Sequence, residues 1–324
     1  MPKHWNPDAL RPGSRNGLKV ELEGYASGIR VEIPFHALVG PNSGPRILLI
    51  AGVHGDEYEG VAALHDVVDE LDPQALTGCV VVVPVANPQA FHAGTRRNPV
   101  DFGDLNRAFP GDPSGTITHR LAAVLFEEFV LGSDAFLSLH GWSKEATVIP
   151  YAEYSLGHGE ALEKSKAAAL HLGMEYLHPY VWPAGVLGDA ATRHGIAAVE
   201  TEVGGMGTIT TEGQVITRAI ILRFLEFWGA IKTGTAPPKS AELRQKIVDH
   251  DDIFAGRAGL FRRTVEIGQQ VSRGEILGRT FGLEGRRLEE HVAPGSGVVA
   301  ILRMNSSVQP GDRLVQLFMR PEPV

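Results

Sequence analysis

The fold is decided by the stretch RILLIAGVHGDEYEG, residues 46–60. Its first part, Ile47 to Ala51, is short, continuous and apolar, which is the pattern of a strand buried on both faces of a parallel sheet. His54 and Glu57 follow at once, three residues apart. Ligands of open α/β sheets bind just beyond the carboxyl ends of the strands. The stretch therefore predicts a parallel sheet with a site at its edge.

A second apolar strand also ends in a histidine. In DAFLSLHGW, residues 134–142, His140 closes the apolar run and a glycine follows it. Parallel strands that end in this way bring both imidazoles to one edge of the sheet. We therefore predict one Zn2+ per chain, held by two histidines and a carboxylate with the fourth position left to water, on His54, Glu57 and His140. The alternative is that these histidines are solvated loop residues.

A third strand carries two carboxylates. In GIAAVETEVGG, residues 195–205, Glu200 and Glu202 are two residues apart, so their side chains share one face of the strand. A carboxylate beside a zinc site supplies the proton transfer that metal-assisted hydrolysis needs. Glu202 is closer to the end of the strand and is predicted to lie nearer the mouth of the site. The alternative makes both carboxylates solvated charges at the sheet edge.

A long loop rich in arginine lies between these strands. Residues 87–111 follow the apolar strand Cys79–Ala86, and their glycines and prolines exclude a regular element. The loop contains four side chains suited to substrate binding: Arg96, Arg97, Asn106 and Arg107. Guanidinium groups grip carboxylates in a bidentate way, so the loop predicts an anionic substrate. The alternative is an ordinary surface network with Asp101 and Asp104. Arg193 is a further candidate for a carboxylate clamp.

Together these motifs resemble those of the succinylglutamate desuccinylase/aspartoacylase family, zinc-dependent deacylases with the fold of the zinc carboxypeptidases. They are His-Gly-Asp-Glu after a strand, Asp-Leu-Asn-Arg-x-Phe-Pro-Gly, a strand-final His-Gly, and Thr-Glu-Val-Gly, in this order over residues 45–210. The resemblance implies zinc on the two histidines and Glu57. It also implies that Glu202 is the general base.

The same resemblance assigns roles within the arginine-rich loop. It implies that Asn106 and Arg107 bind a carboxylate of the substrate. Arg96 is then the residue expected to polarise the scissile carbonyl, with the adjacent Arg97 as its alternative.

The chain is predicted to form an α/β catalytic domain over residues 1–232, with a mainly parallel sheet flanked by helices. Residues 1–45 are expected to be an N-terminal β extension. Helical stretches are expected at residues 60–71, 119–129, 159–172 and 216–231. Residues 233–245 lose all periodicity and are interpreted as a linker.

Frequent glycines cut residues 246–324 into short strands, which predicts a small all-β domain. Its motifs resemble the barrel-sandwich-like half-barrel of biotinyl and lipoyl carriers. Those carriers modify a lysine, and no lysine follows Lys246, so a carrier role is excluded. In the deacylase family, a domain of this kind helps to wall the active site.

Composition excludes several classes of protein. The net charge of -8 over 324 residues, without a basic run, argues against nucleic-acid binding. The single cysteine permits no disulfide within the chain, which fits a reducing compartment. No signal peptide is visible and no segment approaches the roughly 18 apolar residues of a membrane span. We therefore predict a cytoplasmic protein with no membrane partner, and the sequence leaves open whether it forms a homo-oligomer.

The combined prediction is a zinc-dependent amidohydrolase that removes the acyl group from an N-acylated amino acid or a similar small carboxylate. Its partner is accordingly a small anionic N-acyl substrate. Two alternatives stay open. One is a carboxypeptidase-like peptidase acting on short peptides, and the other is a catalytically inactive binding protein that keeps the pocket. A metal-dependent hydrolysis assay separates the binding protein from both enzymes.

Overall fold

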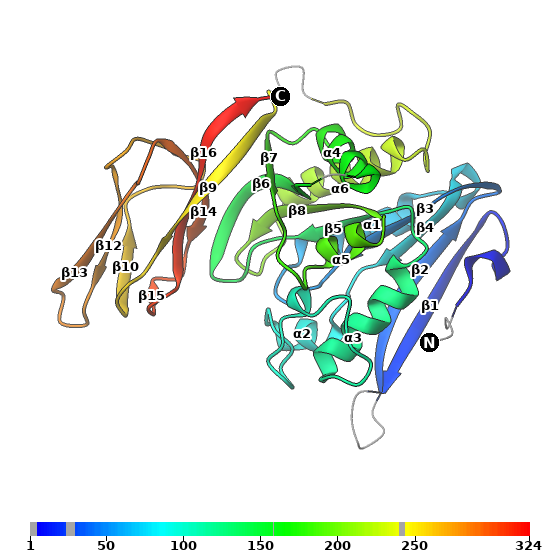
Figure 1. The fold of residues 1–324 in the computed structure, drawn as a ribbon, viewed down its shortest axis with the longest axis horizontal. Coiled ribbons are helices and arrows are strands. Elements are labelled where there is room, and N and C mark those ends of the chain that lie inside the picture. The colour runs from blue at the N-terminus through cyan, green and yellow to red at the C-terminus, as the bar shows by residue number, and fades with distance from the viewer. Residues whose placement is uncertain (1–4, 24–29, 158, 240–243) are drawn as a thin grey trace.

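A mixed sheet runs through the whole molecule (Figure 1). The computed structural model describes residues 5–23, 30–157, 159–239 and 244–324. Within these residues the sheet has twelve strands, in the order β1-β2-β4-β3-β5-β8-β6-β7-β9-β16-β14-β11. The strands before residue 240 are β1 (Ser14–Glu23), β2 (Arg30–Val39), β3 (Asn42–Ala51), β4 (Thr77–Val83), β5 (Ala135–His140), β6 (Ala146–Ser155), β7 (Tyr176–Tyr180) and β8 (Ala197–Gly205).

The centre of the sheet is parallel and its flanks are not. Strands β4, β3, β5 and β8 are parallel neighbours, as the apolar runs predicted. Strands β1 and β2 add to β4 in antiparallel fashion, and β6 runs antiparallel to β8. The connection from β5 to β6 spans residues 141–145, which is too short for the crossover that a parallel return requires. The prediction of a mainly parallel sheet is thus correct for the centre only, and the sheet as a whole is mixed.

Helices cover both faces of this sheet. The helices are α1 (Glu59–Glu70), α2 (Pro88–Ala93), α3 (Ile117–Leu125), α4 (Glu160–His171), α5 (Leu187–Arg193) and α6 (Thr211–Phe227). Short helical turns are η1 (Pro7–Ala9), η2 (Pro73–Ala75), η3 (Leu105–Arg107) and the π-helical η4 (Phe126–Val130). Along β3, Ile47 and Leu49 pack against α1, α4 and α6, while Leu48 and Ile50 pack against α3 and α5. This alternation gives three layers, because successive side chains of a strand point to opposite faces.

The four predicted helical stretches correspond to α1, α3 with η4, α4, and α6. Helix α6 begins five residues earlier than expected, at Thr211. The Thr210 side chain caps it by accepting a hydrogen bond from the Gly213 amide. Gly213, a poor helix former, weakened the sequence signal in this first turn. No helix in the described part of the chain is long and apolar enough to cross a membrane.

Every element described after residue 245 is a strand. They are β9 (Lys246–Phe254), β10 (Gly259–Arg263), β11 (Gln270–Val271), β12 (Ile276–Phe281), β13 (Arg287–Val292), β14 (Gly297–Arg303), β15 (Ser307–Val308) and β16 (Arg313–Pro323). Four of these strands extend the large sheet, since β9 pairs with β7 and β14 also pairs with β6. The other four form a separate sheet in the order β13-β12-β10-β15. Of the predicted linker 233–245, residues 240–243 lie outside the described residues.

Candidate metal centre and active site

The three predicted metal ligands meet at the carboxyl edge of the parallel strands. His54 and Glu57 lie in the turn between β3 and α1, and His140 is the last residue of β5. One potential ligand atom from each lies within 4.8 Å of the others, and all three side chains are buried. The Nδ1 atom of His54 is 2.7 Å from Glu57 Oε1, and that of His140 is 3.0 Å from Glu57 Oε2. The carboxylate thus lies between two imidazole nitrogens.

Polar groups lie behind the two imidazoles. The Nε2 atom of His140 is 2.9 Å from the Ser138 hydroxyl. The Nε2 atom of His54 is 3.3 Å from a carboxylate oxygen of Asp104, but it makes no hydrogen bond with the described residues. The contact with Ser138 thus holds the His140 ring as metal-binding histidines are usually held, and Nδ1 of both rings faces Glu57.

The donor set fits a zinc ion. It consists of two imidazole nitrogens and a carboxylate, which is a known set for catalytic Zn2+. Burial opposes ionisation of Glu57, but His54 and His140 outweigh it and hold the pKa of this carboxyl below its usual range. The ionised form is the one that binds a metal. In the described part of the chain this is the one group of three such side chains close enough to share an ion.

Glu202 lies beside this cluster. On β8 it is the register partner of His140, the last residue of β5. Its Oε2 atom is buried and makes no hydrogen bond with the described residues. Burial, followed by the charges of Glu57 and Glu153, raises the pKa of Glu202 well above its usual range. This carboxyl therefore accepts a proton more readily than an exposed one.

Glu200, on the same face of β8, has other contacts. One of its oxygens accepts a hydrogen bond from the Gly188 amide at 3.3 Å, and the other lies 3.8 Å from His140 Nε2. Glu200 is also more deeply buried than Glu202. The predicted order, with Glu202 nearer the mouth of the site, agrees with this placement.

The structure separates the two adjacent arginines. Arg96 Nε is 3.1 Å from Asp104 Oδ2, and its Nη1 is 3.7 Å from Glu57 Oε1. Arg97 is exposed, donates to the Phe102 carbonyl at 3.4 Å, and is not part of the cavity wall described below. Arg96 is therefore the arginine that the structure brings to the cluster. Arg96 does form the ion pair with Asp104 that the surface-network alternative expected. This ion pair lies beside the metal-ligand cluster and not on the open surface of the protein.

Asn106 and Arg107 lie in the short helix η3, which the Asp104 side chain caps. Asn106 is buried, and its Oδ1 accepts a hydrogen bond from the Leu187 amide at 2.8 Å. Arg107 is exposed and donates to the Asn106 carbonyl at 2.6 Å. One carboxylate, Asp104, thus links His54, Arg96 and the start of η3.

These residues line a cavity of about 240 Å3. The sequence analysis pointed to seven of the 17 residues of the wall: His54, Arg96, Asn106, Arg107, His140, Glu200 and Glu202. It did not assign the other ten, which come from strands β6, β7, β9 and β16 and the segments beside them: Trp142, Tyr151, Glu153, His178, Tyr180, Pro183, Val186, His250, Arg313 and Gln316. Single polar residues in separate strands give no sign that they face one another. Strand pairing, which local periodicity does not show, brings them together.

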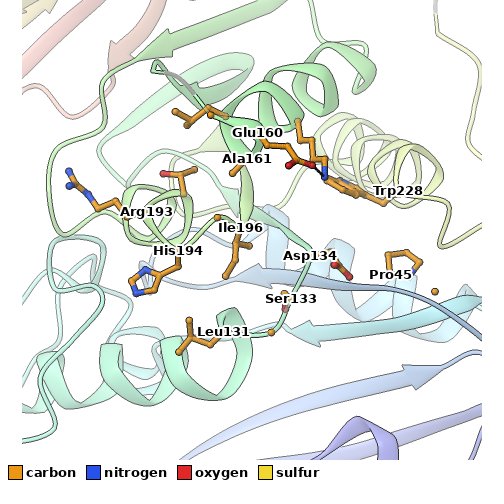
Figure 2. Close-up of a pocket in the computed structure, with 17 residues that line it drawn as sticks. Pro45, Leu131, Ser133, Asp134, Glu160, Ala161, Arg193, His194, Ile196 and Trp228 are labelled. Atoms are coloured by element: carbon orange, nitrogen blue, oxygen red, sulfur yellow. Dashed lines mark ion pairs between the residues drawn. The ribbon is translucent and has the colours of Figure 1, made fainter.

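A larger hollow of about 930 Å3 lies at the opposite edge of the sheet (Figure 2). Its wall includes Asp134 and Ile196, which precede β5 and β8, so it lies at the amino ends of the strands that carry the site. Arg193 lines this hollow and pairs with Asp189 at 2.8 Å. The hypothesis that Arg193 clamps a substrate carboxylate in the active site is therefore wrong.

Comparison with known proteins identifies similar chains. Residues 43–228 match the succinylglutamate desuccinylase/aspartoacylase catalytic domain. The N-alpha-acetyl-L-2,4-diaminobutyric acid deacetylase of Halomonas elongata is 34% identical over 283 residues, 86% of this chain and 83% of that protein. The product-bound ectoine utilization protein EutE (DoeB) from Ruegeria pomeroyi has a similar fold, with a TM-score of 0.88 at 26% identity over 96% of each chain. A succinylglutamate desuccinylase/aspartoacylase structure from Rhodobacter sphaeroides gives a TM-score of 0.87 at 30% identity over 97% of each chain.

Proposed function

Because this chain belongs to the succinylglutamate desuccinylase/aspartoacylase family, we propose that it is a zinc-dependent hydrolase that removes the acyl group from an N-acylated amino acid. The observation that carries the proposal is the buried cluster of His54, Glu57 and His140 with Glu202 as its register neighbour. The 34% identical relative is a deacetylase by name, which supports the same reaction class.

A metal ion bound at this site would supply the Lewis acid of the proposed reaction. Zn2+ held by His54, Glu57 and His140 would polarise the amide carbonyl and lower the pKa of a water molecule. All other steps belong to side chains of the protein. Glu202 accepts the proton of the attacking water and then donates it to the leaving amine.

Two further groups position the substrate. The Arg96 guanidinium, held by Asp104, is placed to donate to the carbonyl oxygen as negative charge develops there. Arg107, beside Asn106 at the cavity wall, is placed to grip the substrate carboxylate. Arg96 would thus bind the carbonyl oxygen of the substrate, and Arg107 would bind its carboxylate.

The size of the cavity favours a deacylase over a carboxypeptidase. About 240 Å3 lies at the small end of ligand pockets, and strands β9 and β16 form one of its walls. A peptide chain needs a longer cleft than this, whereas a small acyl amino acid needs only a compact cavity.

A substrate screen with zinc-loaded protein tests the proposal. N-acyl amino acids should be hydrolysed much faster than tripeptides with a free carboxyl end, and a chelator should abolish the activity. Faster cleavage of the tripeptides would support the peptidase instead. If the protein binds the metal but hydrolyses neither the N-acyl amino acids nor the tripeptides, an inactive binding protein is favoured.

The metal ligands can be tested without an activity assay. His140→Ala should reduce bound zinc from about one per chain to near zero, because two ligands hold the ion poorly. Elemental analysis gives the zinc content, and circular dichroism checks that the fold survives. His92→Ala, at an exposed position of α2, is the matched control and should keep its zinc. Full zinc content in His140→Ala would place the third ligand elsewhere.

A further inference from the structure

Glu59 is a buried carboxylate two residues beyond the predicted metal ligand Glu57. It is the first residue of α1 and is 2% exposed. A carboxylate at such a position is costly unless hydrogen bonds or a cation compensate for the lost water. Its hydrogen-bond partners lie some 150 residues further along the chain, at the start of α6. They show which two parts of the molecule this side chain joins.

Three donors converge on the Glu59 carboxylate. Its Oε1 atom accepts hydrogen bonds from the amide and the hydroxyl of Thr210, both at 2.8 Å. Its Oε2 atom accepts one from the Gln214 side-chain amide at 2.6 Å, and the same nitrogen donates to the Glu59 carbonyl at 2.9 Å. The amino end of a helix also favours a nearby negative charge. Glu59 thus joins the beginning of α1 to the beginning of α6.

The same side chain lies against the exit of β8. A Cβ atom added to Gly204 would be 2.8 Å from Glu59 Cγ, and one added to Gly213 would collide with Glu59 Oε1. Glycine at both positions therefore lets the carboxylate lie between the end of the strand and the first turn of α6. Gly204 follows the predicted general base, Glu202, by two residues. Glu59 thus connects the segment of a predicted metal ligand with the segment of the predicted base.

Strand pairing alone gives Glu202 incomplete support. Its pairing with His140 is the last one between β8 and β5. On the other side, a bulge of β6 lies opposite the stretch from Glu202 to Gly204. A bulge locally disrupts the ladder of hydrogen bonds between two strands. The contact with Glu59 therefore lies where the two neighbouring strands leave the backbone of β8 partly unsupported.

We propose that Glu59 is a positioning residue for the deacylase reaction. Its carboxylate holds the exit of β8, and with it Glu202, at a fixed place relative to the turn that carries His54 and Glu57. Glu59 is not part of the cavity wall and acts through Glu202. Catalysis depends on such placement, since a misplacement of about 1 Å can lower a rate about 100-fold. The inference rests on the proposed function, because Glu202 is the base of that reaction.

Glu59→Ala removes this support and tests the inference in the zinc-loaded protein. With the N-acyl amino acid that the wild type hydrolyses fastest, kcat should fall by roughly 10- to 100-fold. KM should change by less than about 3-fold, because Arg96 and Arg107 come from another loop. The zinc content should stay near one per chain, since the three ligands remain. A merely structural role would lower stability and leave kcat per folded molecule unchanged, which would overturn the inference.

Glu70→Ala is the matched control. Glu70 is the last residue of α1, and its carboxylate pairs with Arg218 of α6 at 2.7 Å. It joins the same two helices, but neither residue lines the cavity. Its loss should leave kcat, KM and zinc content unchanged. An equal fall of kcat in Glu59→Ala and Glu70→Ala would overturn the inference, because helix packing in general would then control the rate.

Two milder variants separate the hydrogen bonds from the bulk of the side chain. Glu59→Gln keeps an oxygen for the two Thr210 donors and should recover most of the kcat that Glu59→Ala loses. Gln214→Ala removes one donor and should lower kcat by roughly 2- to 10-fold. Combined with Glu59→Ala, it should cause no further loss, and additive losses would overturn the inference. If Glu59→Ala does not fold, an unchanged kcat in Gln214→Ala would overturn it.

Crystal structures of zinc-loaded wild type and Glu59→Ala give a readout that needs no activity. Gly204 and Glu202 should move by more than about 0.5 Å relative to His140. Unchanged positions would overturn the inference and leave the deacylase function standing. If the wild type hydrolyses no N-acyl amino acid, the proposed function is overturned, and the catalytic role of Glu59 with it.

Discussion

Glu202 and Glu200 are two residues apart on β8, yet their carboxylates have different contacts. Glu200 accepts a hydrogen bond from the Gly188 amide and lies near His140 Nε2. The Oε2 atom of Glu202, by contrast, is buried and makes no hydrogen bond with the described residues. Glu202→Gln should therefore lower kcat about 100-fold or more with zinc still bound, because an amide cannot take up the proton. Glu200→Gln should have a smaller effect. Steady-state kinetics with zinc analysis would reveal reversed roles if Glu200→Gln were inactive and Glu202→Gln active.

Arg107 and Arg97 offer a second matched pair at the residue scale. Both side chains are exposed, but Arg107 lines the cavity, whereas Arg97 donates to the Phe102 carbonyl away from it. Arg107→Lys keeps the charge but loses the planar pair of donors, so kcat/KM should fall by roughly 10- to 100-fold. Arg97→Lys should leave kcat/KM unchanged. A similar loss in both variants would mean that loop folding, and not carboxylate binding, is affected.

At this scale the sequence pointed to residues that follow or close an apolar run and missed most of those on the strands added from the later part of the chain. His54, Glu57, His140 and Glu202 each follow or close an apolar run, and the sheet edge gathers them. Glu153, His178 and His250 lie within strands, where a polar residue has the same pattern whether it faces water or a cavity. The choice between Arg96 and Arg97 depended on a loop without periodicity. The contacts with Asp104 and Glu57 show only that Arg96, and not Arg97, lies beside the cluster.

The turn between β3 and α1 depends on a close approach to α2. A Cβ atom added to Gly55 would lie 1.9 Å from the carbonyl carbon of Ala90. Gly55→Ala should therefore displace either α2 or the turn that carries His54. We expect a loss of about 1–3 kcal/mol in stability and weaker zinc retention.

A urea titration and elemental analysis measure both effects of Gly55→Ala. The control is Gly17→Ala on β1, where the nearest atom would lie at 3.9 Å. It should change stability by less than about 0.5 kcal/mol. Unchanged stability and zinc content in Gly55→Ala would show that α2 can move to make room for the added methyl group without loss of folding free energy.

The elements themselves were predicted unevenly. Apolar runs located the central parallel strands, since their pattern follows from burial on both faces. The antiparallel course of β6 and the pairing of β9 with β7 were not visible, because each depends on contacts between distant segments. An element whose pattern follows from its own residues, such as a buried strand or a helix with one apolar face, can be predicted from the sequence. The direction and pairing of a strand depend on its partner strand and cannot be predicted in this way.

At the scale of the whole molecule, residues from the end of the chain pack into the body of the catalytic sheet. Phe318 on β16 is 1% exposed. Its ring centroid lies 5.0 Å from that of Tyr151, 5.7 Å from that of Tyr176 and 5.4 Å from that of His178. Phe318→Ala should cost roughly 3–5 kcal/mol of stability. It should also lower kcat/KM, because Tyr151 and His178 line the cavity.

Denaturant unfolding followed by fluorescence and circular dichroism measures this loss. We expect a single coincident transition, because the sheet is continuous from β1 to β11. Leu283→Ala, at a fully exposed position, is the control and should shift the midpoint little. Two separate transitions, with only the later strands weakened by Phe318→Ala, would contradict a shared core.

The strand order has a consequence for how the protein is made. On the ribosome, β6 and β7 emerge long before β14 and β9, the later strands that pair with them. Until those strands are translated, the nascent chain exposes an unpaired strand edge, which invites pairing with other chains. It also lacks His250, Arg313 and Gln316, so the cavity is incomplete. A growing chain can thus bring His54, Glu57 and His140 together early, but it completes the wall of the cavity only after β16 has been translated.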